Sequence, residues 1–231
     1  MNDKPVMLIS GTRTGIGKYL AKYYAGNNYI VVGCSRNKID YKIDNYKHFI
    51  LDVFDESKVK LMFSEIKKNY GRLDVLINNS GVSSKNHVLL TTLNQVKELF
   101  NTNFIGSFLF SRESVKLMKN HNYGRIINIS SIQVPLALEG SSIYCASKAA
   151  VEQFSKVLSK EVFQFGINVN TISLSVVHNT GMEQYLNNKI QQKIINQTIS
   201  KSKLNLPDIS HAINLLISDN SSMITNQILY L

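Results

Sequence analysis

Length, composition and charge exclude several classes of protein. The chain has 231 residues, of which 44% are hydrophobic, so it can bury one large core and we predict a single domain over residues 1–231. No apolar run approaches a membrane span, and the N-terminus leaves no room for a leader; we expect a cytoplasmic protein without a membrane anchor. Cys34 and Cys145 are far apart and lack metal-ligand spacing, which predicts free thiols and no bound metal.

The net charge of +10 suggests an anionic partner. The lysines are spread along amphipathic segments, however, and no basic run alternates with aromatic residues, as a nucleic-acid surface would require. We therefore expect a solvated basic surface and no nucleic-acid partner, with a positive field that suits an anionic cofactor or substrate.

Short apolar runs alternate with segments of helical periodicity along the chain. The apolar runs predict strands at 6–10, 29–34, 48–51, 73–78, 125–129, 167–172 and 227–230. The periodic segments predict helices at 16–26, 56–70, 93–119, 142–164, 182–200 and 207–218. This alternation predicts an α/β fold of the Rossmann type, with a doubly wound parallel sheet of about seven strands covered by helices on both faces.

The periodicity weakens after residue 172, where residues 173–180 show no regular pattern before the next helical segment. A loop and helix beyond the carboxyl end of a strand are placed to cover a substrate in such a sheet. We predict a substrate lid, and with it the specificity of the protein, at about 173–206.

A glycine-rich turn, Ser10-Gly-Thr-Arg-Thr-Gly-Ile-Gly17, lies between the first strand and the first helix. Glycines there allow a sharp turn and a close approach of a pyrophosphate, which the helix N-terminus would then face. The spacing differs from the G-x-G-x-x-G pattern, so taken alone it fits both a dinucleotide site and a plain turn. The residues that we predict to contact a dinucleotide here are Gly11, Arg13, Thr14, Gly15, Ile16 and Gly17.

The end of the second predicted strand indicates which dinucleotide the protein binds. A carboxylate there would bind the ribose 2′-hydroxyl, and a basic side chain would bind a 2′-phosphate. The chain has Ser35 and Arg36 at this point, and the nearest acid, Asp40, comes several residues later. Because the guanidinium fork suits a phosphate, we predict that Ser35 and Arg36 bind NADPH or NADP in preference to NADH.

Three residues have the chemistry that carbonyl reduction requires. Tyr144 and Lys148 are four residues apart, and Ser131 precedes the tyrosine by thirteen. One helical turn places the lysine on the face of the tyrosine, where its charge would favour the phenolate and lower a pKa that is ordinarily near 10. Tyr144 would then transfer the proton, and Ser131 would donate a hydrogen bond to the substrate oxygen. Tyr185 and Lys189 have the same spacing but no serine at the matching distance, and we interpret them as a helix face.

These motifs resemble the short-chain dehydrogenase/reductase family, in its compact single-domain branch, over nearly the whole chain. The resemblance implies that Asn103 completes a catalytic set with Ser131, Tyr144 and Lys148 by holding a water of the proton relay. From their chemistry we also expect Lys148 to hydrogen-bond the nicotinamide ribose, and we place Tyr144 with Lys148 among the cofactor-binding residues. The further residues that the resemblance places at the cofactor are Asp52 and Val53, beside the adenine, and Asn79, Ser80 and Gly81.

The chain departs from the family pattern at several positions. Ser10 replaces a threonine, and Leu174-Ser175 stands where the family has Pro-Gly beside the nicotinamide, which predicts a reshaped wall there. Thr180-Gly-Met182 is similar to the start of the family's lid, shifted by one residue, and the chain ends at Leu231, before the family's usual Asp-Gly-Gly segment. These departures leave open an alternative, a dinucleotide-binding sensor or scaffold with weak chemistry.

The sequence therefore predicts an NADPH-dependent reductase of a ketone or aldehyde, with Tyr144 as the proton donor. The substrate stays open between an acyl thioester, a sugar, a ring ketone and a small ketone. The predicted helices at 93–119 and 142–164 have faces that suit pairing with a second copy, and we expect a homodimer or homotetramer.

Overall fold

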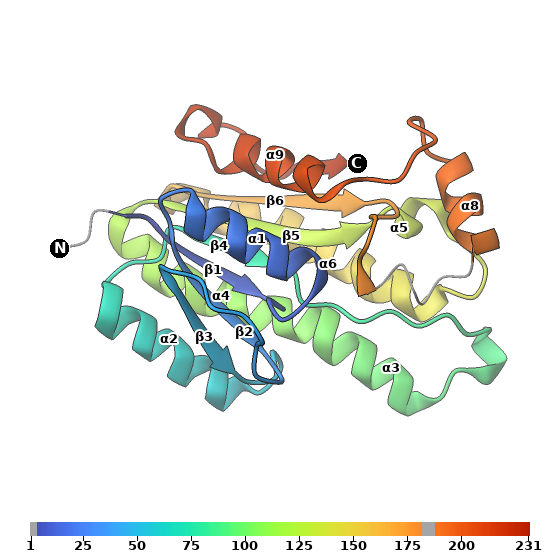
Figure 1. Cartoon of the computed structure of the whole chain (residues 1–231), viewed down its shortest axis with the longest axis horizontal. Coiled ribbons are helices and arrows are strands. Elements are labelled where there is room, and N and C mark those ends of the chain that lie inside the picture. Colours follow the sequence, from blue (N-terminus) through green and yellow to red (C-terminus); the bar gives the residue numbers. More distant parts are fainter. Residues whose placement is uncertain (1–3, 182–187) are drawn as a thin grey trace.

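A computed structural model describes residues 4–181 and 188–231. Seven parallel strands form one sheet in the order β3-β2-β1-β4-β5-β6-β7, which confirms the predicted doubly wound fold (Figure 1). The strands are β1 (Val6–Ser10), β2 (Ile30–Ser35), β3 (Tyr46–Ile50), β4 (Val75–Asn78), β5 (Gly124–Ser131), β6 (Ile167–Leu174) and β7 (Ile228–Tyr230). The chain leaves β1 towards β2 and returns to β4 on its other side, so a topological switch point lies between β1 and β4.

Helices connect the strands at nearly the predicted positions. The helices are α1 (Gly15–Gly26), α2 (Glu56–Tyr70), α3 (Leu93–Phe100), α4 (Gly106–Met118), α5 (Gln133–Leu136), α6 (Ser142–Val162), α8 (Asn188–Asn196) and α9 (Leu206–Ile217). The helix predicted at 93–119 is continuous from Leu93 to Met118, and a π-helical turn, η2 (Asn101–Ile105), lies between its two α-helical parts, α3 and α4. Short α5 had not been predicted, and part of the helix predicted at 182–200 lies outside the described residues.

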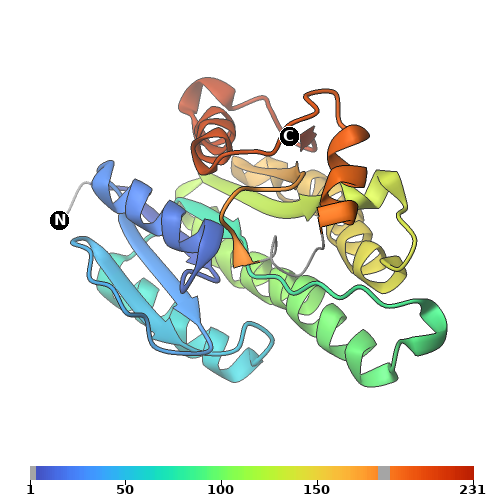
Figure 2. The ribbon, with the colours of Figure 1, turned by 45° about the vertical axis from the view of Figure 1, so that its right-hand side comes forward.

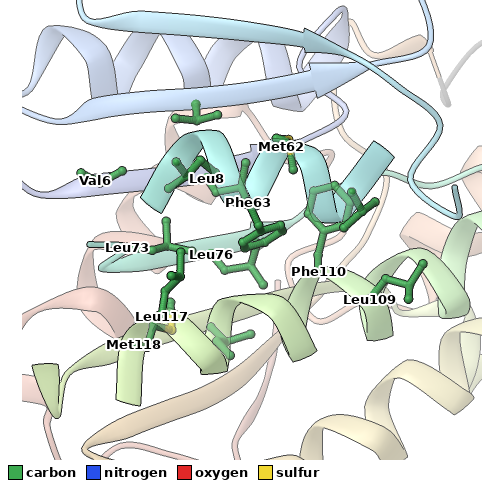
Figure 3. Close-up of a cluster of buried hydrophobic side chains, with 14 of the residues drawn as sticks. Val6, Leu8, Met62, Phe63, Leu73, Leu76, Leu109, Phe110, Leu117 and Met118 are labelled. Atoms are coloured by element: carbon green, nitrogen blue, oxygen red, sulfur yellow. The ribbon is translucent and has the colours of Figure 1, made fainter. Parts of the chain in front are cut away.

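The alternation of side chains along the strands builds a separate apolar core on each face of the sheet. Val6 and Leu8 of β1 pack towards α2, α4 and α6, whereas Met7 and Ile9 pack towards α1 and α9. Figure 3 shows the first of these cores, in which Phe63 and Phe110 from the covering helices lie over the strands. With both faces covered, the carboxyl ends of the strands are the edge at which a ligand can bind.

The segment after β6 forms a small apolar cluster of its own. Val176 packs with Ile194 and Ile195 of α8 and with Leu138, which follows α5. Figure 2 shows α8 beside this end of the sheet. The last residue of the chain returns to the same place, because Leu231 N donates to Ser173 O at 3.1 Å and Ser175 N donates to Leu231 O at 3.0 Å. No helix in the described part of the chain is long and apolar enough to cross a membrane.

Candidate active site

A cleft of about 860 Å³ opens at the carboxyl ends of the strands. All the residues predicted to contact the dinucleotide line this cleft, and so do Ser131, Tyr144 and Lys148. The structure thus brings together the glycine-rich loop after β1, the turn after β2, the segment after β4 and the first turns of α6. Of the predicted site residues, Asn103 alone is absent from the lining of the cleft.

The glycine-rich loop is packed tightly against the segment that follows β4. A Cβ on Gly17 would lie 2.1 Å from the carbonyl oxygen of Gly11, and one on Gly11, which has a φ of +74°, would lie 2.9 Å from Ser80 Oγ. Ser10 Oγ accepts hydrogen bonds from the backbone N–H groups of Asn79 (3.0 Å) and Ser80 (2.9 Å). The serine that replaces the family's threonine therefore holds the two segments together.

The N-terminus of α1 and two arginines suit the phosphates of a dinucleotide. Thr14 makes no side-chain hydrogen bond to α1, and the first turn of that helix contains no acidic residue, so its N–H groups are available to an anion. Among the described residues, the arginines paired with carboxylates are Arg72 and Arg112. The guanidinium groups of Arg13 and Arg36 are therefore available to phosphates, and this part of the cleft fits the predicted cofactor.

Ser131, Tyr144 and Lys148 meet where β5 ends against α6. Ser131 is the last residue of β5. Tyr144 and Lys148 lie one turn apart on α6, and the two residues are only 5% and 3% exposed. Lys148 Nζ donates a hydrogen bond to Ile129 O at 2.8 Å, which holds the ammonium group beside the strand that carries Ser131.

Burial has the largest effect on the pKa of both Tyr144 and Lys148. Burial raises the pKa of Tyr144 to about 12, and hydrogen bonding with Ser131 opposes that increase. Burial also lowers the pKa of Lys148 to about 8, while the negative charge of Glu152 opposes that decrease. The sequence predicted a lowered pKa for the tyrosine, and this was wrong, because helical spacing reveals the neighbouring lysine but not the removal of the phenol from water.

Asn103 lies behind the cleft, in the π-helical turn. Its Nδ2 donates to Val82 O at 3.0 Å and to Ser147 Oγ at 2.9 Å, and its Oδ1 accepts from Val82 N at 2.9 Å. The side chain thus ties the segment after Gly81 to α6. Its predicted part in a proton relay stays a prediction.

The departures from the family pattern lie in or next to the cleft. Leu174 and Ser175 line it, as do Thr180 and Gly181. The hydroxyl of Ser175 is buried and has no hydrogen-bond partner among the described residues, so a polar atom is available in the wall where the family has glycine. Met182, like Tyr185, lies outside the described residues, and so does the side chain of Lys189.

Sequence reasoning missed several residues that line the cleft. Glu98 and Thr102 come from α3 and the π-helical turn, and Ile132 and Gln133 follow Ser131. Only Gln133 was considered from the sequence, where a pocket and a surface turn were equally compatible with it. The others carry no local signal, because their approach to the cleft depends on how the helices pack.

A groove of about 910 Å³ adjoins the cleft along α8. Leu138 and Ile190 give it apolar walls, and Lys85 and Lys193 line it as well. Burial and the charge of Lys193 lower the pKa of Lys85, so the two ammonium groups lie within electrostatic range of each other. Ile194 lines the cleft and follows Lys193 directly, which makes α8 a wall that the groove and the cleft share.

Comparisons with known proteins agree with this architecture. The short chain dehydrogenase family model matches residues 5–191. The 3-oxoacyl-(acyl-carrier-protein) reductase FabG of Rickettsia conorii is 33% identical over 96% of this chain and 93% of its own length. FabG of Haemophilus influenzae is 28% identical over 97% of this chain and 95% of its own length. Among solved structures, ElxO with NADP bound superposes with a TM-score of 0.89 at 28% identity, covering 98% of this chain and 96% of that chain.

The chain belongs to the short-chain dehydrogenase family, as the sequence motifs predicted. It is an NAD(P)-dependent oxidoreductase that acts on CH–OH and C=O groups. The alternative of a sensor or scaffold without efficient chemistry is not favoured by these comparisons.

Proposed function

We propose that the protein reduces a ketone or aldehyde with NADPH, and that Asn103, Ser131, Tyr144 and Lys148 form its catalytic set. The observation that carries this proposal is the single cleft shared by the glycine-rich loop, Arg36 and the pair Tyr144 and Lys148. A bound nicotinamide would supply the hydride. Ser131 would hydrogen-bond the substrate oxygen as it gains negative charge, and Tyr144 would give it a proton.

The raised pKa of Tyr144 suits the direction of reduction. A phenol with a pKa of about 12 keeps its proton throughout the neutral range and is available as a donor. Lys148, held by Ile129 O, would orient the nicotinamide ribose and stabilise the phenolate that remains after the transfer.

The preference for NADPH is supported by charge. Arg36 is exposed at the end of β2, and a guanidinium group there suits a 2′-phosphate better than a hydroxyl. The similar solved structure of ElxO has NADP bound. We assign the adenine-binding role to Asp52 and Val53, which line the same cleft.

The groove along α8 supports a substrate with an extended tail. Its apolar walls would bind an acyl chain, and its two lysines would bind an anionic group further from the carbonyl. The curated relatives named above are reductases of 3-oxoacyl groups on acyl carrier protein. We propose a 3-oxoacyl thioester as the first substrate to assay and assign specificity to the region 173–206, of which 182–187 lie outside the described residues.

The experiment that tests this function is a titration of the purified protein with NADPH and NADH, followed by fluorescence, and then turnover against a panel of ketones that includes a 3-oxoacyl thioester. We expect tighter binding of NADPH. Arg36→Ala should weaken the binding of NADPH about 10- to 100-fold and leave the binding of NADH nearly unchanged. Tight binding without turnover on any substrate would contradict the reductase and support the sensor.

We also propose a cytosolic homodimer or homotetramer that pairs through α4 and α6. Phe104 and Phe154 stack edge-to-face with ring centroids 6.0 Å apart, and Phe108 packs on Phe154 at the same distance. All three rings are partly exposed, and Val157 is 47% exposed on the same helix. Such a face suits a partner of equal shape.

Light scattering during gel filtration measures this association. We expect at least a dimer for the wild-type protein, and a monomer when Phe104 and Phe154 are both changed to Glu, because each buried carboxylate opposes pairing. Phe163→Glu, which alters an exposed ring just beyond α6, is the matched control. A monomeric wild-type protein would contradict the proposal.

A further inference from the structure

A chain of hydrogen bonds crosses the end of β2 and joins the glycine-rich loop to the turn after β2, the two parts of the cleft that we propose bind phosphates. Thr12 Oγ, in the glycine-rich loop, lies 2.7 Å from Tyr46 OH, and Tyr46 OH lies 2.7 Å from His48 Nδ1. His48 Nε2 lies 3.0 Å from Ser35 Oγ. Ser35 Oγ then donates to Asn37 O at 2.7 Å. We call these five residues the β2–β3 relay.

The donors and acceptors of the relay follow one direction. Since the Ser35 hydroxyl donates to Asn37 O, its oxygen is available to accept the N–H of His48 Nε2. In a neutral ring Nδ1 then accepts from the Tyr46 hydroxyl, whose oxygen can accept from Thr12. Burial lowers the pKa of His48, which keeps the ring in the neutral form that this order requires.

The backbone leaves room for the relay at one position. Gly33 of β2 stands opposite His48 of β3 in the parallel register. A Cβ on Gly33 would lie 2.2 Å from Tyr46 OH and 2.5 Å from Thr12 Oγ. A glycine in the middle of a strand costs stability, and here it allows two side chains to meet above the strand.

The relay ends on the turn that presents Arg36. His48 contacts the residue on either side of this arginine, Ser35 through its hydroxyl and Asn37 through its carbonyl oxygen at 3.4 Å. The relay thus restrains the backbone from which the guanidinium projects. It begins at Thr12, whose carbonyl oxygen also accepts from Tyr41 OH, so the turn and the glycine-rich loop are held in register with each other.

We propose that His48 is a positioning residue for the adenosine 2′-phosphate, and that by holding the turn at Arg36 it sets the preference for NADPH over NADH. The inference depends on the NADPH preference proposed above. NADPH and NADH differ only in the 2′-phosphate, so a defect confined to this turn changes the affinity for NADPH alone. A defect in the fold of this half of the sheet would lower the affinity for both dinucleotides.

The test compares dissociation constants for NADPH and NADH, measured by fluorescence titration of the full chain. We expect His48→Leu to weaken NADPH about tenfold, the effect of losing its hydrogen bonds, and to change NADH less than about twofold. His48→Gln should keep NADPH within about threefold of wild type, because its amide can still donate to Ser35. His121 is an exposed histidine outside the cleft. His121→Leu is therefore the matched control, and it should change neither dissociation constant.

Each outcome decides the inference. If His48→Leu loses affinity for NADPH and NADH equally, or keeps the wild-type preference for NADPH, the inference is overturned while the proposed function stands. A wild-type protein that prefers NADH overturns the proposed cofactor preference, and the inference fails with it. If His48→Leu does not fold, as judged by circular dichroism, Tyr46→Phe decides instead, because it keeps the ring and removes only the hydroxyl that orients His48. Loss of NADPH preference in that variant supports the inference, and full retention overturns it.

Discussion

Tyr144→Phe is expected to lower kcat for carbonyl reduction by about 10³-fold, with a Kd for NADPH within about threefold of wild type. The change removes the phenol oxygen and leaves the ring of a residue that is only 5% exposed and lies at the start of α6. Without that oxygen the proton must come from solvent, from which the buried position is shielded. Stopped-flow measurement of NADPH oxidation, together with a fluorescence titration, separates the chemical step from binding.

Tyr70→Phe is the matched control for this change. Tyr70 is the last residue of α2, packs against the core beneath the sheet and does not line the cleft. It should keep wild-type kcat. A Tyr144→Phe enzyme with more than about a tenth of wild-type kcat would contradict the proposed role, because general acid catalysis contributes at least about 10²-fold.

Lys148→Met is expected to raise the free energy of unfolding at pH 7 by about 2 kcal/mol while lowering turnover by about 100-fold. Burial lowers the pKa of this lysine from 10.5 to about 8, a shift that costs the folded state about 3 kcal/mol. Methionine fills similar space without a charge, although it gives up the hydrogen bond to Ile129 O. The net gain in stability is therefore smaller than the full cost of burial.

The gain in stability of Lys148→Met over the wild-type protein decreases as the pH rises. The pKa of Lys148 is lower in the folded than in the unfolded chain, so the unfolded chain binds more protons between about pH 8 and 10.5 and the wild-type protein becomes more stable across that window. The advantage of Lys148→Met is complete below pH 8 and closes as the pH rises towards 10.5. Urea unfolding of both proteins at pH 7 and 9.5 measures it.

Lys156→Met provides the control, since Lys156 lies on the same helix and is exposed. Its free energy of unfolding should change by less than about 0.5 kcal/mol at either pH. A Lys148→Met protein that is less stable than wild type at pH 7 would show that the ammonium group stabilises the fold, contrary to the argument from burial.

Local patterns in the sequence were sufficient for most of the elements. The strand predicted at 6–10 and the helix predicted at 56–70 agree with β1 and α2 residue for residue. Asp55 caps α2 by accepting from Lys58 N, and Gly71 ends it in a left-handed conformation; both signals are local. The π-helical turn inside the helix predicted at 93–119 was not visible in the sequence, because it lies where the Asn103 side chain bonds Val82 and Ser147, which are distant in sequence.

The sequence by itself determined the family and the residues of the cleft that lie in short motifs, since the chemistry of the glycine turn and of the Tyr-xxx-Lys pair follows from residue type and spacing. Only the tertiary structure decided the direction of the Tyr144 pKa, because burial arises from segments that meet only in the fold. It likewise decided that His48 meets Ser35, since the parallel register of β2 and β3 brings them together. Spacing along the chain specifies chemistry within one element, whereas the packing between elements sets the environment in which that chemistry operates.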